Sequence, residues 1–287
     1  MPRTLTLMVA LAWLALSCSE SAEQESSSTN EEVSTSLDPS SPGESVQKVA
    51  DLSLNEMESA ETQYLVPSPG EVLSSLDKLD RVPWSQLASY ETKADYDDKH
   101  ARSFNLGVRV ADAFMAVNAE DAAQFGEMST IVFDLAREIG LGEVLESQRG
   151  ELDNLAAEGR WEELKAALDN VQNDVRSEVE AMGEDELIVL ASVGGWMEGM
   201  AAVTAHLKEN YSAEHAQLLQ QTELLTYFLQ KIKAMEGPAR EHPLVQQAEE
   251  TLQKLLPLIE GEEVPSLAET QQIHTFTSAL VEQIEQG

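Results

Sequence analysis

The residues with the clearest chemical potential lie in two short segments that depart from ordinary helix composition. In the first segment, helical spacing places four polar side chains along one stripe: Arg102, Asn105, Arg109 and Asp112. In the second segment, Glu198 lies on a face of small residues that includes Gly194 of the adjacent pair Gly194-Gly195. A carboxylate on such a closely packing face needs a partner, because an unpaired buried charge is strongly destabilising.

We expect the helices that carry these two segments to cross each other. Small side chains around Gly194 let another backbone approach closely, and basic residues are scarce in this chain. Arg109 or Arg102 is therefore the expected partner of Glu198. Asn105 and Asp112 are expected to complete the network.

This network supports two interpretations. The first is a buried ion pair that fixes the register of two helices. The second is a polar pocket that binds a small ligand or performs acid–base chemistry. Trp196, on the adjoining face, is the candidate aromatic residue of such a pocket, and a place in the core is its alternative role.

Other catalytic and cofactor chemistries lack their signatures. The sequence contains no phosphate-cradling Gly-Lys-Ser/Thr loop and no Gly-x-Ser-x-Gly elbow. Its histidines, which form no His-Glu-x-x-His motif, are His100, His206, His215, His242 and His274. His206 and Glu209 lie one helical turn apart, but two such ligands are expected by chance in so acidic a chain. We therefore expect no catalytic residue, no metal and no cofactor.

Helices must position the candidate residues, because the pattern from about residue 61 onward is helical. Apolar residues recur at helical spacing, and neither strand-like alternation nor a hairpin signal occurs. The predicted helices lie at about 69–79, 93–115, 121–139, 144–157, 161–183, 185–210, 212–236, 243–260 and 266–286. The sequence thus predicts an all-α fold, a single multi-helix bundle of about eight or nine helices with no sheet.

The N-terminal residues resemble the export signal of a bacterial lipoprotein. Arg3 precedes an apolar stretch at 4–16, which is shorter than the roughly 20 residues of a membrane-spanning helix. Ala15-Leu16-Ser17-Cys18 follows, resembles a lipobox and holds the chain's sole cysteine. We expect a signal peptide at 1–17, lipidation of Cys18, an acidic Ser/Glu-rich disordered tether at 18–60 and a helical domain at 61–287. An ordinary signal peptide or an uncleaved anchor are the alternatives.

The charge of the chain restricts its partners. Its 52 acidic and 18 basic residues give a formal net charge of −34. Few cations remain to displace phosphate counterions, so we expect no nucleic-acid partner. The expected attachment is to a membrane through the N-terminal lipid, in the bacterial cell envelope. Ser19 behind the cysteine favours the outer membrane, with the domain facing the periplasm or the cell surface.

Three short motifs follow one another along the chain. They are Pro67-Ser68-Pro69-Gly70-Glu71, then Asn105-Leu106-Gly107-Val108 with Ala111-Asp112, and then Gly194-Gly195-Trp196-Met197-Glu198-Gly199. Over about residues 64–200 this order resembles a group of uncharacterised bacterial envelope lipoproteins, of a kind common in Bacteroidetes-like genomes. The resemblance implies an exported helical lipoprotein and no particular activity. It also implies that position 109 varies, which favours Asn105, Asp112 and Glu198 as the residues of the network.

A non-catalytic binding or interaction module is the function that these features favour, with another envelope protein or a small ligand as its partner. The alternative is a ligand-binding or hydrolytic domain with a polar pocket around Asn105, Asp112 and Glu198. A deep cavity at those residues would distinguish the alternative from the favoured function. The sequence favours a protein that is not an enzyme, but it leaves this question open.

Overall fold

The computed structural model of the chain describes residues 82–183 and 185–287. The helices in these ranges are α3 (Trp84–Leu87), α4 (Lys99–Asn118), α5 (Ala122–Glu138), α6 (Gly142–Ala157), α7 (Trp161–Met182), α8 (Asp185–Glu209), α9 (Ala213–Ala216), the 3₁₀ helix η1 (Gln217–Leu219), α10 (Thr222–Ala234), α11 (Gly237–Glu241), α12 (Pro243–Ile259) and α13 (Leu267–Gln286). No strand occurs in the described ranges, and the predicted all-α bundle is confirmed. The predicted signal peptide, the Cys18 lipobox, the tether at 18–60 and the helix at 69–79 lie outside these ranges.

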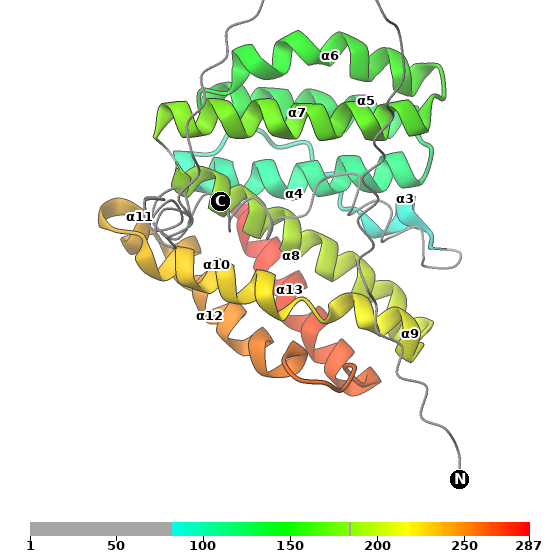
Figure 1. Cartoon of the computed structure of the whole chain (residues 1–287), viewed down its shortest axis with the longest axis vertical. Helices are drawn as coiled ribbons and strands as arrows, with labels where there is room; N and C mark the ends of the chain where they lie inside the picture. Colours follow the sequence, from blue (N-terminus) through cyan, green and yellow to red (C-terminus); the bar gives the residue numbers. More distant parts are fainter. Residues whose placement is uncertain (1–81, 184) are drawn as a thin grey trace, which may run out of the picture. The chain divides into compact units, whose positions relative to one another are not determined.

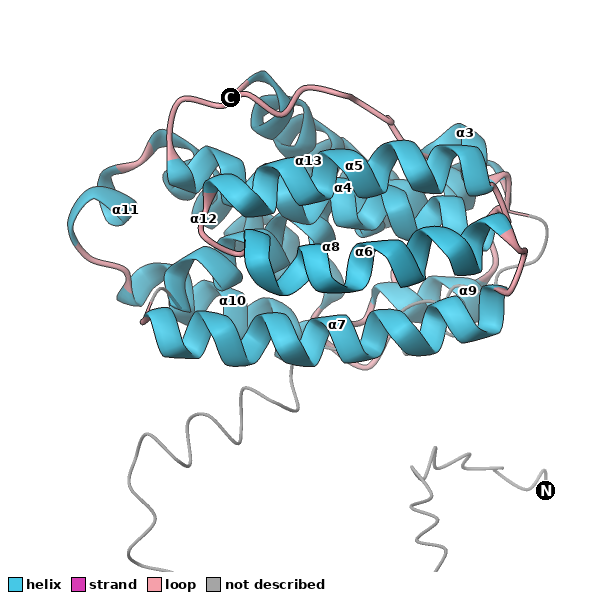
Figure 2. Cartoon of the chain, turned by 90° about the horizontal axis from the view of Figure 1, so that it is seen from above, coloured by secondary structure: helices cyan, strands magenta, loops and turns pink. Residues whose placement is uncertain are grey.

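Two groups of helices meet at α8 (Figure 1). In the first group, α4, α5, α6 and α7 pack each against the next in chain order. In the second group, α12 packs against both α10 and α13. Helix α8 contacts α4 and α13 extensively and also touches α7 and α10. Figure 2 shows that helices and their connecting loops make up all of the described chain.

Helix α8 is the most apolar long element of the bundle. Its length and mean hydropathy of 1.5 would suffice to cross a membrane, and it is the one helix of the described ranges that meets this test. However, 67% of its apolar window is buried inside the bundle. This burial is typical of a core helix, and it agrees with the position of α8 between the two groups.

Capping residues explain several of the helix boundaries. The side chain of Asp121 accepts hydrogen bonds from two backbone amides at the start of α5. Ser266 and Glu269 form a reciprocal capping box at the start of α13. Helices α6 and α7 are followed by Gly159 and Gly183, which have φ angles of 69° and 68° that suit glycine.

Two of the predicted helices differ from those in the structure. Helix α4 begins at Lys99 and not near residue 93, because Asp98 caps it. The predicted helix at 212–236 is divided into α9, η1 and α10. The side chain of Gln220 donates hydrogen bonds to the carbonyls of Gly261 and Glu263, at 3.3 and 3.0 Å. These contacts with a distant loop hold the chain out of the helical path, and local spacing cannot reveal them.

Candidate functional site

Helices α4 and α8 cross in direct backbone contact at three glycines. A Cβ atom added to Gly107 would overlap the carbonyl oxygen of Ala191 and lie 2.7 Å from the backbone nitrogen of Gly195. A Cβ atom on Gly195 would lie 3.0 Å from the carbonyl oxygen of Gly107. The close approach expected for the Gly194-Gly195 segment is therefore present. It brings the polar stripe of α4 against Glu198.

Arg109 is the centre of the buried polar network and is fully buried (0% exposed). Its Nη1 donates a 2.9 Å hydrogen bond to the carbonyl oxygen of Glu91 and lies 3.0 Å from Oδ2 of Asp112. Its Nη2 donates to the carboxylate of Glu285 on α13. One guanidinium group thus joins α4, α13 and the segment at 88–98.

Asp112 and Glu198 form a pair of buried carboxyl groups. Burial is the main cause that raises the pKa of Asp112 to about 6, and the Arg109 charge opposes this rise. Burial, followed by the charge of Asp112, raises the pKa of Glu198 well above its ordinary value. The hydrogen bond between the two groups raises the pKa of Glu198 and lowers that of Asp112. Of the two carboxyl groups, Glu198 therefore favours the protonated form.

The expected partners of Glu198 need a correction. No ion pair joins Glu198 to Arg109 or Arg102 in the part of the chain that the structure describes. Arg109 pairs instead with Asp112 and Glu285, so position 109 is central to the network. Arg102 is half-buried, and its buried Nε has no hydrogen-bond partner.

Asn105 and Trp196 form their hydrogen bonds with groups other than Asp112 and Glu198. Asn105 is fully buried, and its Nδ2 donates to the carbonyls of Ala101 and Ile284, at 2.9 and 2.7 Å. It therefore ties α4 to the end of α13. The indole nitrogen of Trp196 donates to Gln221 at 2.9 Å, and its ring packs edge-on against Phe228. Trp196 thus packs toward α10, in agreement with a role in the core.

The segment at 88–98 covers the network with two tyrosines that sequence inspection missed. The hydroxyl groups of Tyr90 and Tyr96 are buried and have no hydrogen-bond partner. Burial, with Asp112 and Asp121 adding to it, raises the pKa of Tyr90 to about 12. Burial likewise raises the pKa of Tyr96 to about 12. Both phenols stay neutral at physiological pH, and they close the network from solvent.

Replacing Glu198 with glutamine should change how stability depends on pH. An acid whose pKa is raised in the folded protein stabilises it fully below the unfolded value, 4.5 for Glu198, and loses this contribution as pH rises through the folded value. Glutamine keeps a hydrogen-bond donor and cannot ionise. The free energy of unfolding of the wild type, relative to Glu198→Gln, should therefore fall as pH rises from 5 to 9, by up to about 1 kcal/mol per pH unit. Urea denaturation at several pH values measures this difference, and a constant difference would contradict the assignment.

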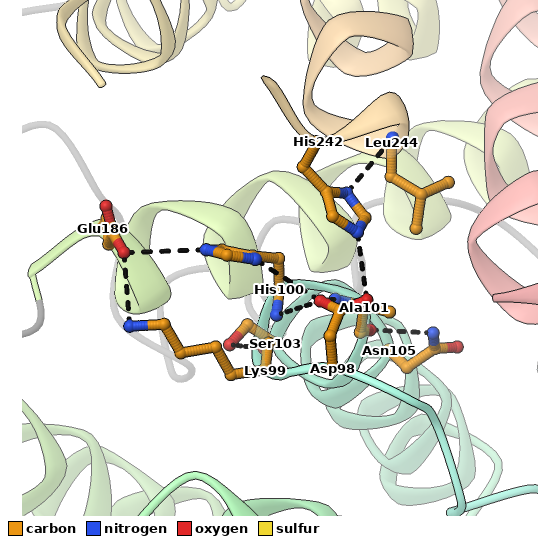
Figure 3. Close-up of polar contacts among 9 residues, drawn as sticks. All are labelled: Asp98, Lys99, His100, Ala101, Ser103, Asn105, Glu186, His242 and Leu244. Carbon is orange, nitrogen blue, oxygen red and sulfur yellow. Dashed lines mark hydrogen bonds and ion pairs between the residues drawn. The ribbon is translucent and has the colours of Figure 1, made fainter. Parts of the chain in front are cut away.

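A second polar cluster joins the starts of three helices (Figure 3). Asp98 caps α4, His242 caps α12, and Glu186 lies in the first turn of α8. Nε2 of His242 lies 3.0 Å from Oδ2 of Asp98, and Nδ1 of His100 lies 3.4 Å from Oδ1 of the same carboxylate. On its other side, His100 places Nε2 3.7 Å from Glu186. Asp98 thus lies between two imidazoles.

The electrostatics of this cluster favour an ionised Asp98. Burial raises the pKa of Asp98, but hydrogen bonds from the Ala101 amide, from His242 and from the His100 amide outweigh it and lower the pKa overall. No local pattern indicates this cluster, because His242 lies 144 positions from Asp98. His206, which lies one helical turn from Glu209, is buried. Burial and the nearby charge of His215 lower the pKa of His206.

Comparison of the chain with protein-family models, curated proteins and solved structures found no match. The functional argument therefore rests on the residues of this chain and on the geometry of its described helices.

Proposed function

We propose that this chain is a lipid-anchored protein of the bacterial cell envelope, and that its helical domain is a non-catalytic binding module. In this proposal residues 1–17 are a signal peptide, Cys18 carries the lipid, and the acidic segment at 18–60 tethers the helices. The apolar stretch at 4–16 and the lipobox-like Ala15-Leu16-Ser17-Cys18 support the anchor. The order of the three sequence motifs supports it independently.

The burial of the polar network carries the non-catalytic part of the proposal. Asn105, Arg109 and Asp112 are 0% exposed, and Glu198 is 4% exposed. A ligand in solution reaches these groups only if the segment at 88–98 moves away or if α4 separates from α8, and the backbones of these two helices are in contact at Gly107 and Gly194. Raised carboxyl pKa values accompany burial as well as catalysis. Because these carboxyl groups are buried, their raised pKa values favour a structural network over the alternative of a ligand-binding or hydrolytic pocket.

Lipid attachment is tested by expressing the full chain in a bacterium with two membranes and determining the mass of its N-terminal peptide. The expected product begins at Cys18, carries acyl chains and sediments with the membranes. The variant Cys18→Ser should lack the lipid mass, whereas the matched control Ser19→Ala should keep it. A chain that retains residues 1–17 with an unmodified Cys18 thiol would overturn the anchor.

The binding role has a separate test, because anchoring alone does not establish it. Native mass spectrometry of the protein released gently from the membrane should show a second envelope protein bound to the lipidated chain. A small molecule retained in place of a protein partner would instead support the alternative pocket. Loss of that molecule in Asp112→Asn would then locate it at the network.

A further inference from the structure

The cluster of Asp98, His100 and His242 has the composition and spacing of a metal site. Imidazole nitrogen and carboxylate oxygen are common ligands of Zn²⁺ and related divalent ions. One potential ligand atom from each of the three residues lies within 4.8 Å of the others. Each residue is fixed at or near the start of a helix, so the three side chains are held by rigid elements.

The imidazole nitrogens of His100 and His242 both lie close to the Asp98 carboxylate. Zinc bonds of about 2.0–2.2 Å at tetrahedral angles place neighbouring ligand atoms about 3.3–3.5 Å apart. His100 Nδ1 lies 3.4 Å from Oδ1 of Asp98, and His242 Nε2 lies 3.0 Å from Oδ2 of the same carboxylate. Because the two nitrogens face different oxygens, side-chain rotations must bring them onto one ion.

His100 provides an independent indication of a ligand. Its side chain is 8% exposed, and its buried Nε2 has no hydrogen-bond partner within range. If Nδ1 binds a metal, the proton of a neutral imidazole lies on Nε2, which faces Glu186 at 3.7 Å. A histidine that binds a metal commonly donates its other N–H to a carboxylate in this way. Metal binding at Nδ1 would therefore make Nε2 a hydrogen-bond donor to Glu186.

Asp98 is both oriented and accessible. Its Oδ1 accepts hydrogen bonds from the amides of His100 and Ala101, at 2.8 and 3.1 Å, which fixes the plane of the carboxylate. Its side chain is 42% exposed, so an ion can enter from solvent and a water molecule can occupy a fourth position. The carboxylates of Asp98 and Glu186 would offset the charge of a divalent ion, against the Lys99 ammonium 3.4 Å from Glu186 and the positive ends of the helix dipoles.

His242 imposes a specific cost on metal binding. Its Nδ1 accepts a 3.3 Å hydrogen bond from the amide of Leu244, which caps α12. Coordination through Nε2 moves the proton to Nδ1, which then no longer accepts this hydrogen bond. Metal binding must therefore release the Leu244 amide, and this change distinguishes coordination from a simple ionic cluster.

We propose that Asp98, His100 and His242 bind a divalent transition metal ion, Zn²⁺ by the chemistry of the ligands, with Glu186 holding the outer nitrogen of His100. The site is independent of the proposed lipid anchor and of the network around Arg109. It has three protein ligands and a fourth position open to solvent, which is the composition of a site that exchanges its fourth ligand.

The test is calorimetric titration of the full chain in detergent with Zn²⁺, together with visible absorption after addition of Co²⁺. We expect one ion per chain and the intense absorption of tetrahedral cobalt. Two variants remove a ligand and keep the helix cap: Asp98→Ser for α4 and His242→Asn for α12. Each should weaken zinc binding at least about 100-fold, since even outer partners contribute about 10–100-fold. Glu186→Gln should weaken it about 10-fold.

His215→Gln is the matched control, because it removes a histidine outside the cluster and should leave the affinity unchanged. In NMR spectra, zinc should shift the Leu244 amide and accelerate its hydrogen exchange. Unchanged zinc binding in Asp98→Ser and His242→Asn, with both variants folded by circular dichroism, would overturn the proposal. Absence of zinc binding by the wild type would overturn it as well, and would leave the cluster as a purely ionic contact among three helices.

Discussion

Replacing Gly194 with alanine is expected to lower the free energy of unfolding by about 1–3 kcal/mol, because added atoms in a packed core are destabilising. The new Cβ would overlap the carbonyl oxygen of Phe104 and lie 3.2 Å from the Cα of that residue. These are backbone atoms of α4, so no change of rotamer relieves the overlap, and the two helices must separate. Urea denaturation monitored by circular dichroism measures the effect.

Gly199 provides a control within the same helix. A Cβ atom added at Gly199 meets nothing within 4 Å. Gly199→Ala should therefore stabilise the protein by about 0.5–1 kcal/mol, since alanine is the better helix former. The account requires opposite signs for the two substitutions. If both stabilised the protein, the helices would not cross as closely as the structure has them.

Removing the guanidinium group by Arg109→Met is expected to destabilise the protein by about 3–5 kcal/mol, because it leaves buried carboxylates without their cation. Asp112 is fully buried and Glu285 is largely buried, and both face Arg109. Without the positive charge the pKa of Asp112 rises further, so protonation relieves part of the loss. The destabilisation should be larger at pH 8 than at pH 5.

An exposed ion pair supplies the comparison for Arg109. Arg137 lies 2.8 Å from Asp134, and its side chain is 64% exposed. Because solvent screens such a pair, Arg137→Met should change the free energy of unfolding by less than about 1 kcal/mol. Adding Asp112→Asn to Arg109→Met should recover part of the lost stability. Equal effects of Arg109→Met and Arg137→Met would show that the network is open to solvent.

The sequence was most informative where the relevant residues are close along the chain. The stripe that contains Arg109 and Asp112 repeats at helical spacing, and the Gly194-Gly195 pair departs from ordinary helix composition. The polar stripe predicted the α4 side of the crossing, and the glycine pair predicted the α8 side. The all-α class followed in the same way from local periodicity.

The remaining features depend on long-range contacts that no local pattern encodes. Glu285 lies 176 positions from Arg109, and acids are so common here that one more carries no signal. Helical spacing places Arg109 and Asp112 on one stripe, but it does not distinguish Asp112 from Glu198 as the carboxylate that pairs with the arginine. Burial and the charge of Asp112 instead raise the pKa of Glu198 and favour its protonated form. His242, 144 positions from Asp98, likewise reaches that carboxylate only in the folded bundle.

The central claim is that the carboxyl groups at the α4–α8 crossing form a closed part of the core. Carbon-13 NMR titration of the side-chain carboxyls of Asp112 and Glu198 tests it most directly, with Glu198→Gln used to assign the signals. The account predicts that Asp112 titrates near pH 6 and that Glu198 titrates well above the ordinary range of a glutamate. Titration of both groups near pH 4, as for carboxyls in water, would contradict it and indicate an open site.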